Sequence, residues 1–251
     1  MRVAIISDIH GNDTALEAVL TDIQARGGVD QYWILGDLAA IGPSPVAVLQ
    51  RLSELPNAHF VRGNTDRYVC TGDRPPPSFA ETAANPELVP VLSEVAGTFA
   101  WTQGAINQGG WFDWLSALPL EMSFMLPDGT KVLGVHASPG QDDGQGVKIS
   151  MRKAEFVAMV ENCDADLILV GHRHRPMDVT VGLKRVVNAG SVSNPSAPDL
   201  RACYALLVAD EKGYNIEHHR ADYDREKVIA LLEQQRHPGA KFIISHLRGE
   251  R

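Results

Sequence analysis

The 251-residue sequence has few cysteines, no long apolar run and no excess of positive charge. Its three cysteines are scattered and form no C-x-x-C pair, which disfavours a disulfide scaffold or a thiolate metal site. No apolar stretch approaches the roughly 18 residues of a membrane span, and the first residues do not resemble a signal peptide. These absences predict a cytoplasmic protein that does not cross a membrane.

The charge balance and two missing motifs narrow the function further. The formal net charge is −8, which argues against stable binding to nucleic acid. A phosphate substrate stays open, because bound divalent metals can reverse the local field. The sequence has neither a G-x-x-x-x-G-K-[ST] phosphate loop nor a G-x-S-x-G elbow, so no protein nucleophile is evident. A homo-oligomer is compatible with all of this.

Apolar segments alternate with helical patterns in the first quarter of the chain. Residues 3–6, 32–35 and 59–61 have the composition of buried strands, and residues 15–23 and 46–55 have apolar side chains at helical spacing. Strands that alternate with helices predict an α/β fold.

The alternation stops after residue 64. Residues 80–118 are predicted to be helical, with Trp101, Trp111 and Trp114 as apolar anchors. Strands are expected again at 131–135 and 166–170, followed by a hairpin around Gly182, late strands at 202–208 and 214–217, and a helix at 223–235. We therefore expect one domain over residues 1–251, with a helical, cap-like insertion at about 70–120.

Side chains of metal-ligand type follow five of the predicted strands. They are Asp8, His10, Asp37, Asn64, His136, His172 and His174. Ligands bind at the carboxyl ends of strands in open α/β sheets, so these groups are expected at one edge. Asp8 and His10 can share one ion, whereas His172 and His174 could share an ion or diverge to two. Such ligands suit manganese, iron, cobalt, nickel or zinc.

These segments resemble the calcineurin-like metallophosphoesterase superfamily, and most of all its small bacterial and archaeal phosphodiesterases. The matching stretches are Ser7-Asp8-Ile9-His10-Gly11-Asn12, Leu35-Gly36-Asp37, Arg62-Gly63-Asn64-Thr65-Asp66, Val135-His136-Ala137-Ser138-Pro139, Val170-Gly171-His172-Arg173-His174 and Asn188-Ala189-Gly190-Ser191-Val192. The resemblance runs from about residue 1 to 210 and is weakest over 70–130. It implies a four-layer αββα sandwich, in which two mixed sheets lie face to face between helices.

The resemblance also implies a dinuclear centre. One metal would be held by Asp8, His10 and His174, and the other by Asn64, His136 and His172. Asp37 would bridge both ions, for which manganese is expected first. The nucleophile would be a hydroxide between the metals, attacking phosphorus in line with the leaving oxygen.

Thr65 departs from the commoner family pattern. Many members have histidine at this position, where it is proposed to protonate the leaving group, and the pKa of a threonine hydroxyl is far too high for that role. The departure favours phosphodiester hydrolysis of a small or nucleotide-like substrate. The alternatives are a phosphomonoesterase or nucleotide pyrophosphatase with the same metals, or a non-catalytic scaffold such as a retromer subunit whose site is degraded.

Asn12, Thr65 and Arg173 are predicted to contact the substrate. The alternative for Asn12 is a helix N-cap, and for Arg173 a solvated or structurally paired arginine. Two further expectations are local: an ion pair between Asp66 and its neighbour Arg67, and a solvated turn at residues 142–144.

Overall fold

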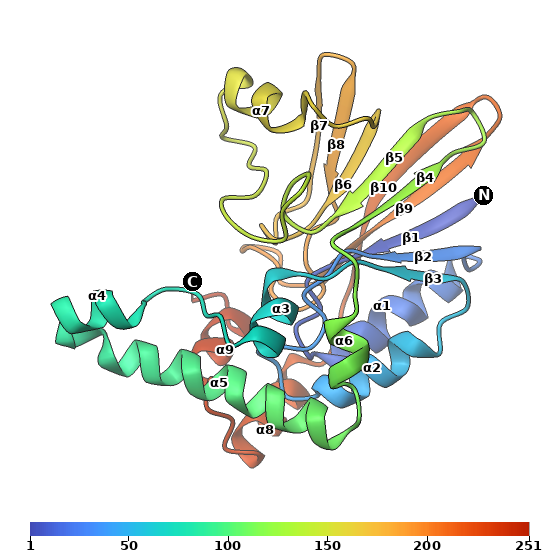
Figure 1. Cartoon of the computed structure of the whole chain (residues 1–251). Helices are drawn as coiled ribbons and strands as arrows, with labels where there is room; N and C mark the ends of the chain where they lie inside the picture. Colours follow the sequence, from blue (N-terminus) through green and yellow to red (C-terminus); the bar gives the residue numbers. More distant parts are fainter. Residues whose placement is uncertain (251) are drawn as a thin grey trace.

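The computed structural model describes residues 1–250, which form two five-stranded sheets stacked between helices (Figure 1). The strands are β1 (Arg2–Ile6), β2 (Gln31–Ile34), β3 (Ala58–Phe60), β4 (Glu121–Met125), β5 (Lys131–Val135), β6 (Leu167–Val170), β7 (Met177–Val181), β8 (Lys184–Asn188), β9 (Ala202–Asp210) and β10 (Gly213–Ala221). The helices are α1 (Asp13–Ala25), α2 (Pro45–Ser53), α3 (Asn64–Thr71), α4 (Phe79–Ala84), η1 (Pro86–Leu88), α5 (Val89–Gln108), α6 (Phe112–Ser116), α7 (Lys153–Val160), α8 (Arg225–Gln234) and α9 (Ala240–Leu247).

Both sheets are mixed. The first sheet has the order β10-β9-β1-β2-β3, with β1, β2 and β3 parallel and β9 antiparallel to β1. The second sheet has the order β4-β5-β6-β8-β7, with a parallel centre and an antiparallel strand at each edge. The four-layer α/β architecture that the resemblance implied is confirmed.

The central strands are apolar on both faces because each sheet is covered on both sides. In β1, Val3 and Ile5 point into the core between the sheets, while Ala4 and Ile6 point to the helices, and all four are fully buried. This is the two-sided burial that an uninterrupted apolar run predicts for a parallel strand.

The two helical layers differ in size. Seven helices contribute to the core on the outer face of the first sheet, whereas α7 is the one helix of residues 1–250 that packs into the core of the second sheet's outer face (Figure 1). Phe156 and Val160 of α7 are its buried contacts. One face of the second sheet is therefore much more lightly covered.

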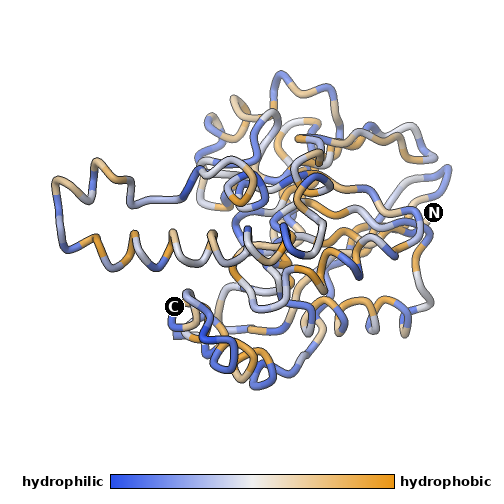
Figure 2. The backbone as a smooth tube through the Cα atoms, turned by 60° about the horizontal axis from the view of Figure 1, so that its bottom comes forward, coloured by the Kyte–Doolittle hydropathy of each residue, from blue (hydrophilic) through white to orange (hydrophobic). Residues whose placement is uncertain are grey.

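The predicted helical insertion corresponds to helices α3 to α6, which lie between β3 and β4 in the sequence. Trp111 and Trp114 pack against the outer core of the first sheet, and Trp101 contacts His237. Helix α4 and the start of α5 extend away from the body as an arm (Figures 1 and 2). A cap function for this arm stays a prediction.

Strand β4 and helix α9 were not among the predicted elements. Strand β4 alternates exposed and half-buried residues because it is an edge strand that pairs only with β5. Helix α9 is short and buries Ile243 and Leu247 against the same core as α8. Both elements are stabilised by tertiary contacts rather than by a strong local pattern.

His237 follows α8 and carries a neutral imidazole in the fold. The residue is buried, its Nδ1 accepts a hydrogen bond from the Gly239 N–H at 3.1 Å, and its Nε2 has no hydrogen-bond partner in residues 1–250. Burial lowers the pKa of His237 to about 4. In the unfolded chain the pKa of the same imidazole is near 6.5. As the pH falls, His237 is therefore protonated in the unfolded chain before it is protonated in the folded one.

We expect His237→Asn to reduce the acid sensitivity of the fold. Asparagine can accept the hydrogen bond from the Gly239 N–H but cannot titrate. The wild type loses stability below about pH 6.5 because its unfolded state binds a proton at His237, and the variant does not have this loss. Between pH 7 and 4.5 the wild type should lose about 2 kcal/mol more free energy of unfolding than the variant. Urea unfolding of both proteins in the same chelator, at several pH values, measures the free energy of unfolding. The same pH dependence in the wild type and the variant would contradict the prediction.

Candidate metal centre

The backbone is bent into an uncommon conformation at five of the predicted ligands. A positive φ is rare outside glycine and costs on the order of 1–3 kcal/mol, so it persists only where the surrounding structure enforces it. The five are Asp8 (φ 56°), His10 (48°), Asp37 (55°), His172 (65°) and His174 (54°). Sharp turns at the strand exits thus redirect these side chains toward one place.

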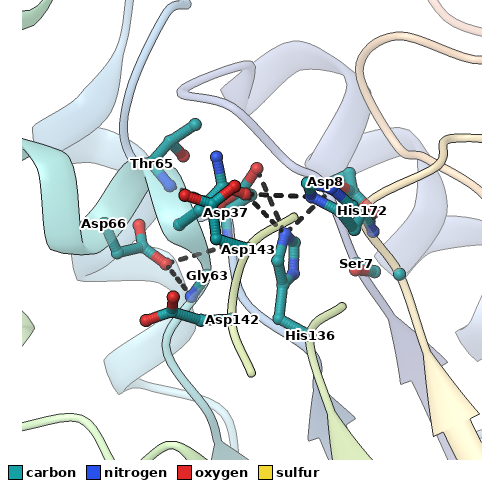
Figure 3. Close-up of polar contacts among 12 residues, drawn as sticks. Ser7, Asp8, Asp37, Gly63, Thr65, Asp66, His136, Asp142, Asp143 and His172 are labelled. Carbon is teal, nitrogen blue, oxygen red and sulfur yellow. Dashed lines mark hydrogen bonds and ion pairs between the residues drawn. The ribbon is translucent and has the colours of Figure 1, made fainter. Parts of the chain in front are cut away.

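The seven predicted ligands come together where the two sheets meet. They follow β1, β2, β5 and β6 at their carboxyl ends, except for Asn64, which begins α3. Figure 3 shows Asp8, Asp37 and His136 pointing toward one another. Five of the ligands are buried and the other two, His172 and His174, are partly exposed. Both sheets contribute to the site, since His136, His172 and His174 follow strands of the second sheet.

One group of ligand atoms surrounds His174. Its Nε2 lies 3.1 Å from Asp8 Oδ1 and 3.1 Å from His10 Nε2. Asp37 Oδ2 lies 3.6 Å from His10 Nε2. The ligand atoms of these four residues are all within 4.8 Å of one another, which makes them a candidate metal-binding cluster.

A second group surrounds Asn64. Its Oδ1 lies 3.2 Å from His136 Nε2 and 3.0 Å from His172 Nδ1. Asp37 Oδ2 lies 3.4 Å from His136 Nε2. The same carboxylate oxygen therefore contacts both groups, and Asp37 stands between them.

The hydrogen bonds around the second group call for a cation. His136 Nδ1 donates to the Leu35 carbonyl at 2.6 Å, and His172 Nε2 donates to the Gly144 carbonyl at 2.9 Å. The opposite nitrogen of each neutral ring then presents a lone pair to the oxygen of Asn64. With the amide oxygen of Asn64 turned to both rings, three acceptors face one another, and a positive charge between them, from a proton or a metal ion, stabilises the arrangement.

The first group gives the same indication. Asp8 is fully buried, and its Oδ1 faces the Nε2 atoms of His174 at 3.1 Å and His10 at 3.9 Å without a well-aligned hydrogen bond within residues 1–250. Burial opposes ionisation of Asp8 and Asp37, but the charges on His174 and His136 respectively outweigh it and hold the pKa of each carboxyl below its usual range. Buried carboxylates with neighbouring imidazoles fit divalent transition metals.

In the absence of metal, the histidines of the site differ in their protonation state. Burial lowers the pKa of His10 to about 4 and also lowers that of His172, so both rings are neutral near pH 7. Burial also opposes protonation of His136, but the Asp37 carboxylate outweighs it and raises the pKa of His136 to about 10. A metal ion at His136 would therefore have to displace a proton.

Asp66 holds the loops that carry two of the ligands. Its carboxylate accepts hydrogen bonds from the N–H groups of Asp37 (2.8 Å), Leu38 (2.9 Å) and Gly63 (2.9 Å), and it is 1% exposed (Figure 3). Burial and the Asp37 charge raise its pKa to about 7. The predicted ion pair with Arg67 is wrong, because consecutive residues of α3 point in different directions.

Arg67 instead joins a network with the turn at residues 142–144. It donates to Asp142, to Asp143 and to Asp73, and Arg62 also donates to Asp142 at 2.7 Å. Asp142 is only 6% exposed, so the expected solvated turn is wrong at this residue, whereas Asp143 is partly exposed and Gly144 is exposed. Two arginines from another part of the chain cover Asp142, and Gly144 supplies the carbonyl that orients His172.

The three predicted substrate contacts differ in their surroundings. Asn12 caps α1 by accepting from the Ala15 N–H at 3.0 Å, which is the alternative considered for it. The Thr65 N–H donates to Asp37 Oδ1 at 2.9 Å, while its Oγ1 is buried without a partner in the described chain. Arg173 is exposed beside the two ligand histidines. Contact with a substrate stays a prediction for all three.

Comparison with known families agrees with this geometry. The calcineurin-like phosphoesterase superfamily domain matches residues 1–212. The chain belongs to this superfamily. This phosphoesterase is 30% identical to an uncharacterized protein of Methanocaldococcus jannaschii over 94% of its own length and 93% of the relative's. A symmetrical bis(5'-nucleosyl)-tetraphosphatase of Erwinia tasmaniensis is 37% identical, but over only 28% of the chain and 26% of that protein.

Solved structures share the fold of this phosphoesterase along its whole length. A metallophosphoesterase from Sphaerobacter thermophilus is 25% identical, with a TM-score of 0.75 and coverage of 99% and 98% of the two chains. A hypothetical protein from Pyrococcus horikoshii has a TM-score of 0.81 at 21% identity, covering 98% and 97%, which shows the fold alone. Within residues 1–250, no helix combines the length and apolarity that crossing a membrane needs.

Proposed function

We propose that this phosphoesterase hydrolyses phosphodiester bonds of a small or nucleotide-like substrate at a two-metal centre. Asp8, His10 and His174 would hold one ion, Asn64, His136 and His172 the other, and Asp37 both. The observation that carries the proposal is the position of Asp37, whose Oδ2 lies 3.6 Å from His10 Nε2 and 3.4 Å from His136 Nε2. Manganese is the first metal to test.

The chain's own part in the reaction is to hold the ligand side chains in place. Two bound divalent ions would supply neutralisation of the phosphate charge and acidification of an attacking water. Leu35 and Gly144 orient the rings of His136 and His172 through their carbonyl groups. Asp66 holds the loop of Asp37. These contacts organise the centre before a substrate arrives.

Thr65 supports the choice of a diester. Its N–H is engaged with Asp37, and its hydroxyl cannot deliver a proton near pH 7. A leaving group that departs without protonation is therefore favoured. Monoesters with poor leaving groups should react slowly.

Paired aryl substrates test this preference. With manganese at pH 7, we expect kcat/KM for bis(p-nitrophenyl) phosphate to exceed that for phenyl phosphate by about tenfold or more, since phenolate is a poor leaving group and no acid protonates it. Thr65→His should raise the monoester rate relative to the diester rate, with Thr65→Ser as the matched control. A wild-type enzyme that prefers the monoester would overturn the proposed specificity.

A second candidate function is hydrolysis of a phosphoanhydride bond in a dinucleoside polyphosphate. The partial match to symmetrical bis(5'-nucleosyl)-tetraphosphatases favours it. Assay of diadenosine tetraphosphate, with separation of the nucleotide products, distinguishes this activity from simple diester cleavage. A non-catalytic scaffold has less support, because all seven positions retain residues that can bind a metal.

We further propose that the protein works in a reducing, cytoplasmic setting. All three cysteines are free thiols, and burial raises the pKa of Cys70 and Cys203 to about 11. Thiols that stay protonated near pH 7 are poor nucleophiles and poor metal ligands. The cysteines then serve as packing residues.

A further inference from the structure

A small polar cavity lies beside the proposed metal centre. It has a volume of about 250 Å³, close to the lower end of small-molecule sites. Three basic side chains, Lys148, Arg173 and Arg175, line it together with the hydroxyl residues Ser150 and Ser196. None of its lining residues in the described chain is acidic.

The cavity shares a wall with the proposed metal ligands. Arg173 stands between His172 and His174 in the sequence, and Gly144, in the segment before Lys148, accepts a hydrogen bond from His172 Nε2 at 2.9 Å. A methyl group built on Gly146, whose φ is +54°, would lie 2.7 Å from His172 Cδ2 and 3.2 Å from Arg173 Cδ. An anion in the cavity would therefore lie close to a phosphate held by the metals.

The three cations lack acidic partners. Among residues 1–250 none of Lys148, Arg173 and Arg175 forms a salt bridge, although the chain carries a net charge of −8. Like charges gathered without counter-charges repel one another and attract anions. This cluster has an electrostatic cost that a bound anion would remove.

A neighbouring cavity shows the contrast. It is lined by Arg62 and Arg67 as well as by Asp142 and Asp143. Both arginines already donate to those carboxylates, so their charge is neutralised. Of these two cavities, the one at Lys148 offers uncompensated positive charge next to the ligand histidines.

We propose that this cavity binds a second phosphate group of the substrate, distinct from the one attacked at the metals. This inference rests on the proposed function and specifies its substrate class: a nucleotide-like ester or anhydride that carries at least one further phosphate. Arg173 and Arg175 provide planar, forked donors suited to phosphate oxygens, and Lys148 provides a point charge. The subsite positions the substrate and takes no part in bond breaking.

Binding without metal tests the cavity directly. We would titrate inorganic triphosphate into the chelator-treated full-length protein by calorimetry, comparing the wild type with the double variant Lys148→Gln/Arg175→Gln. The dissociation constant should rise about tenfold or more, as expected for losing charged hydrogen bonds. The control is Lys212→Gln in the turn between β9 and β10, at the opposite end of the first sheet. Equal affinity of the double variant and the wild type would overturn the proposal.

Kinetics with metal then separates a substrate subsite from a site for free phosphate. The measured quantity is the ratio of kcat/KM for diadenosine tetraphosphate to that for bis(p-nitrophenyl) phosphate, which has no second phosphate. The double variant should lower this ratio about tenfold or more, and Lys212→Gln should not change it. An unchanged ratio, with triphosphate binding lost, would assign the cavity to free phosphate and overturn the subsite.

The two proposals fail in different ways. If the loaded enzyme hydrolyses no diester or anhydride but triphosphate binding depends on Lys148 and Arg175, the proposed function fails and the anion site stands. If diesters are hydrolysed but neither binding nor the ratio responds to the double variant, the inference fails and the proposed function stands. Urea unfolding of each variant confirms that the fold is intact.

Discussion

Replacing Asp37 by asparagine is expected to lower kcat about 100- to 1,000-fold. The carboxylate oxygen Oδ2 lies between the two groups of ligand atoms, so its charge would act on both metal ions. Losing that interaction should cost several kcal/mol of transition-state stabilisation, and about 1.4 kcal/mol corresponds to tenfold in rate. Metal analysis after desalting should show fewer bound ions in the variant than in the wild type.

The matched control for this experiment is Asp178→Asn. Asp178 lies on β7, four residues after His174, and its partly exposed carboxylate pairs with Arg185 at 2.7 Å instead of with a predicted ligand. Its substitution should leave kcat and metal content close to wild-type values, because exposed ion pairs contribute little. Full hydrolysis by Asp37→Asn would rule out the two-metal mechanism.

Asp66→Ala is expected to reduce the free energy of unfolding by about 3–5 kcal/mol, which is large for one substitution. The change leaves three buried N–H groups, of Asp37, Leu38 and Gly63, without their acceptor. A buried donor without a partner costs about 1–3 kcal/mol. Manganese affinity should also fall about 10- to 100-fold, because the Asp37 loop loses its support.

Urea unfolding of the chelator-treated protein measures the stability effect, and a manganese titration measures the second. Asp66→Asn is the conservative comparison, since its single oxygen can keep part of the hydrogen bonding and should give an intermediate loss. Asp178→Ala controls for removal of an exposed acid and should cost at most about 1 kcal/mol. An Asp66→Ala variant as stable as this control would show that the loops do not depend on Asp66.

Local patterns were enough for the first part of the fold. Residues 3–6 are apolar on both faces, and the apolar spacing of residues 15–23 is helical, so β1 and α1 could be predicted without knowledge of their neighbours. The same holds for the ligand types at the strand exits. The turn at Asp8-x-His10 itself is held by tertiary contacts, because the N–H groups of Asp8 and His10 donate to the carbonyls of the loop after β2.

Contacts between distant segments could not be predicted in the same way. The pairing of Asp66 with three backbone N–H groups depends on how α3 begins against the loop after β2. Adjacency in the sequence suggested Arg67 instead, but neighbours on a helix diverge. Asp142 is buried only because Arg62 and Arg67 reach it from a segment some eighty residues earlier in the chain.

The sequence by itself determined which side chains of metal-ligand type follow the strands, because side-chain type and strand-exit position are local properties. It also determined the absence of a histidine at position 65, on which the proposed preference for diesters rests. Only the tertiary structure decided that Asp37 stands between the two ligand groups and that three uncompensated cations gather beside His172. Those arrangements depend on how the two stacked sheets bring their strand exits together at the site. The segments involved are far apart in the sequence and contact one another only in the folded chain.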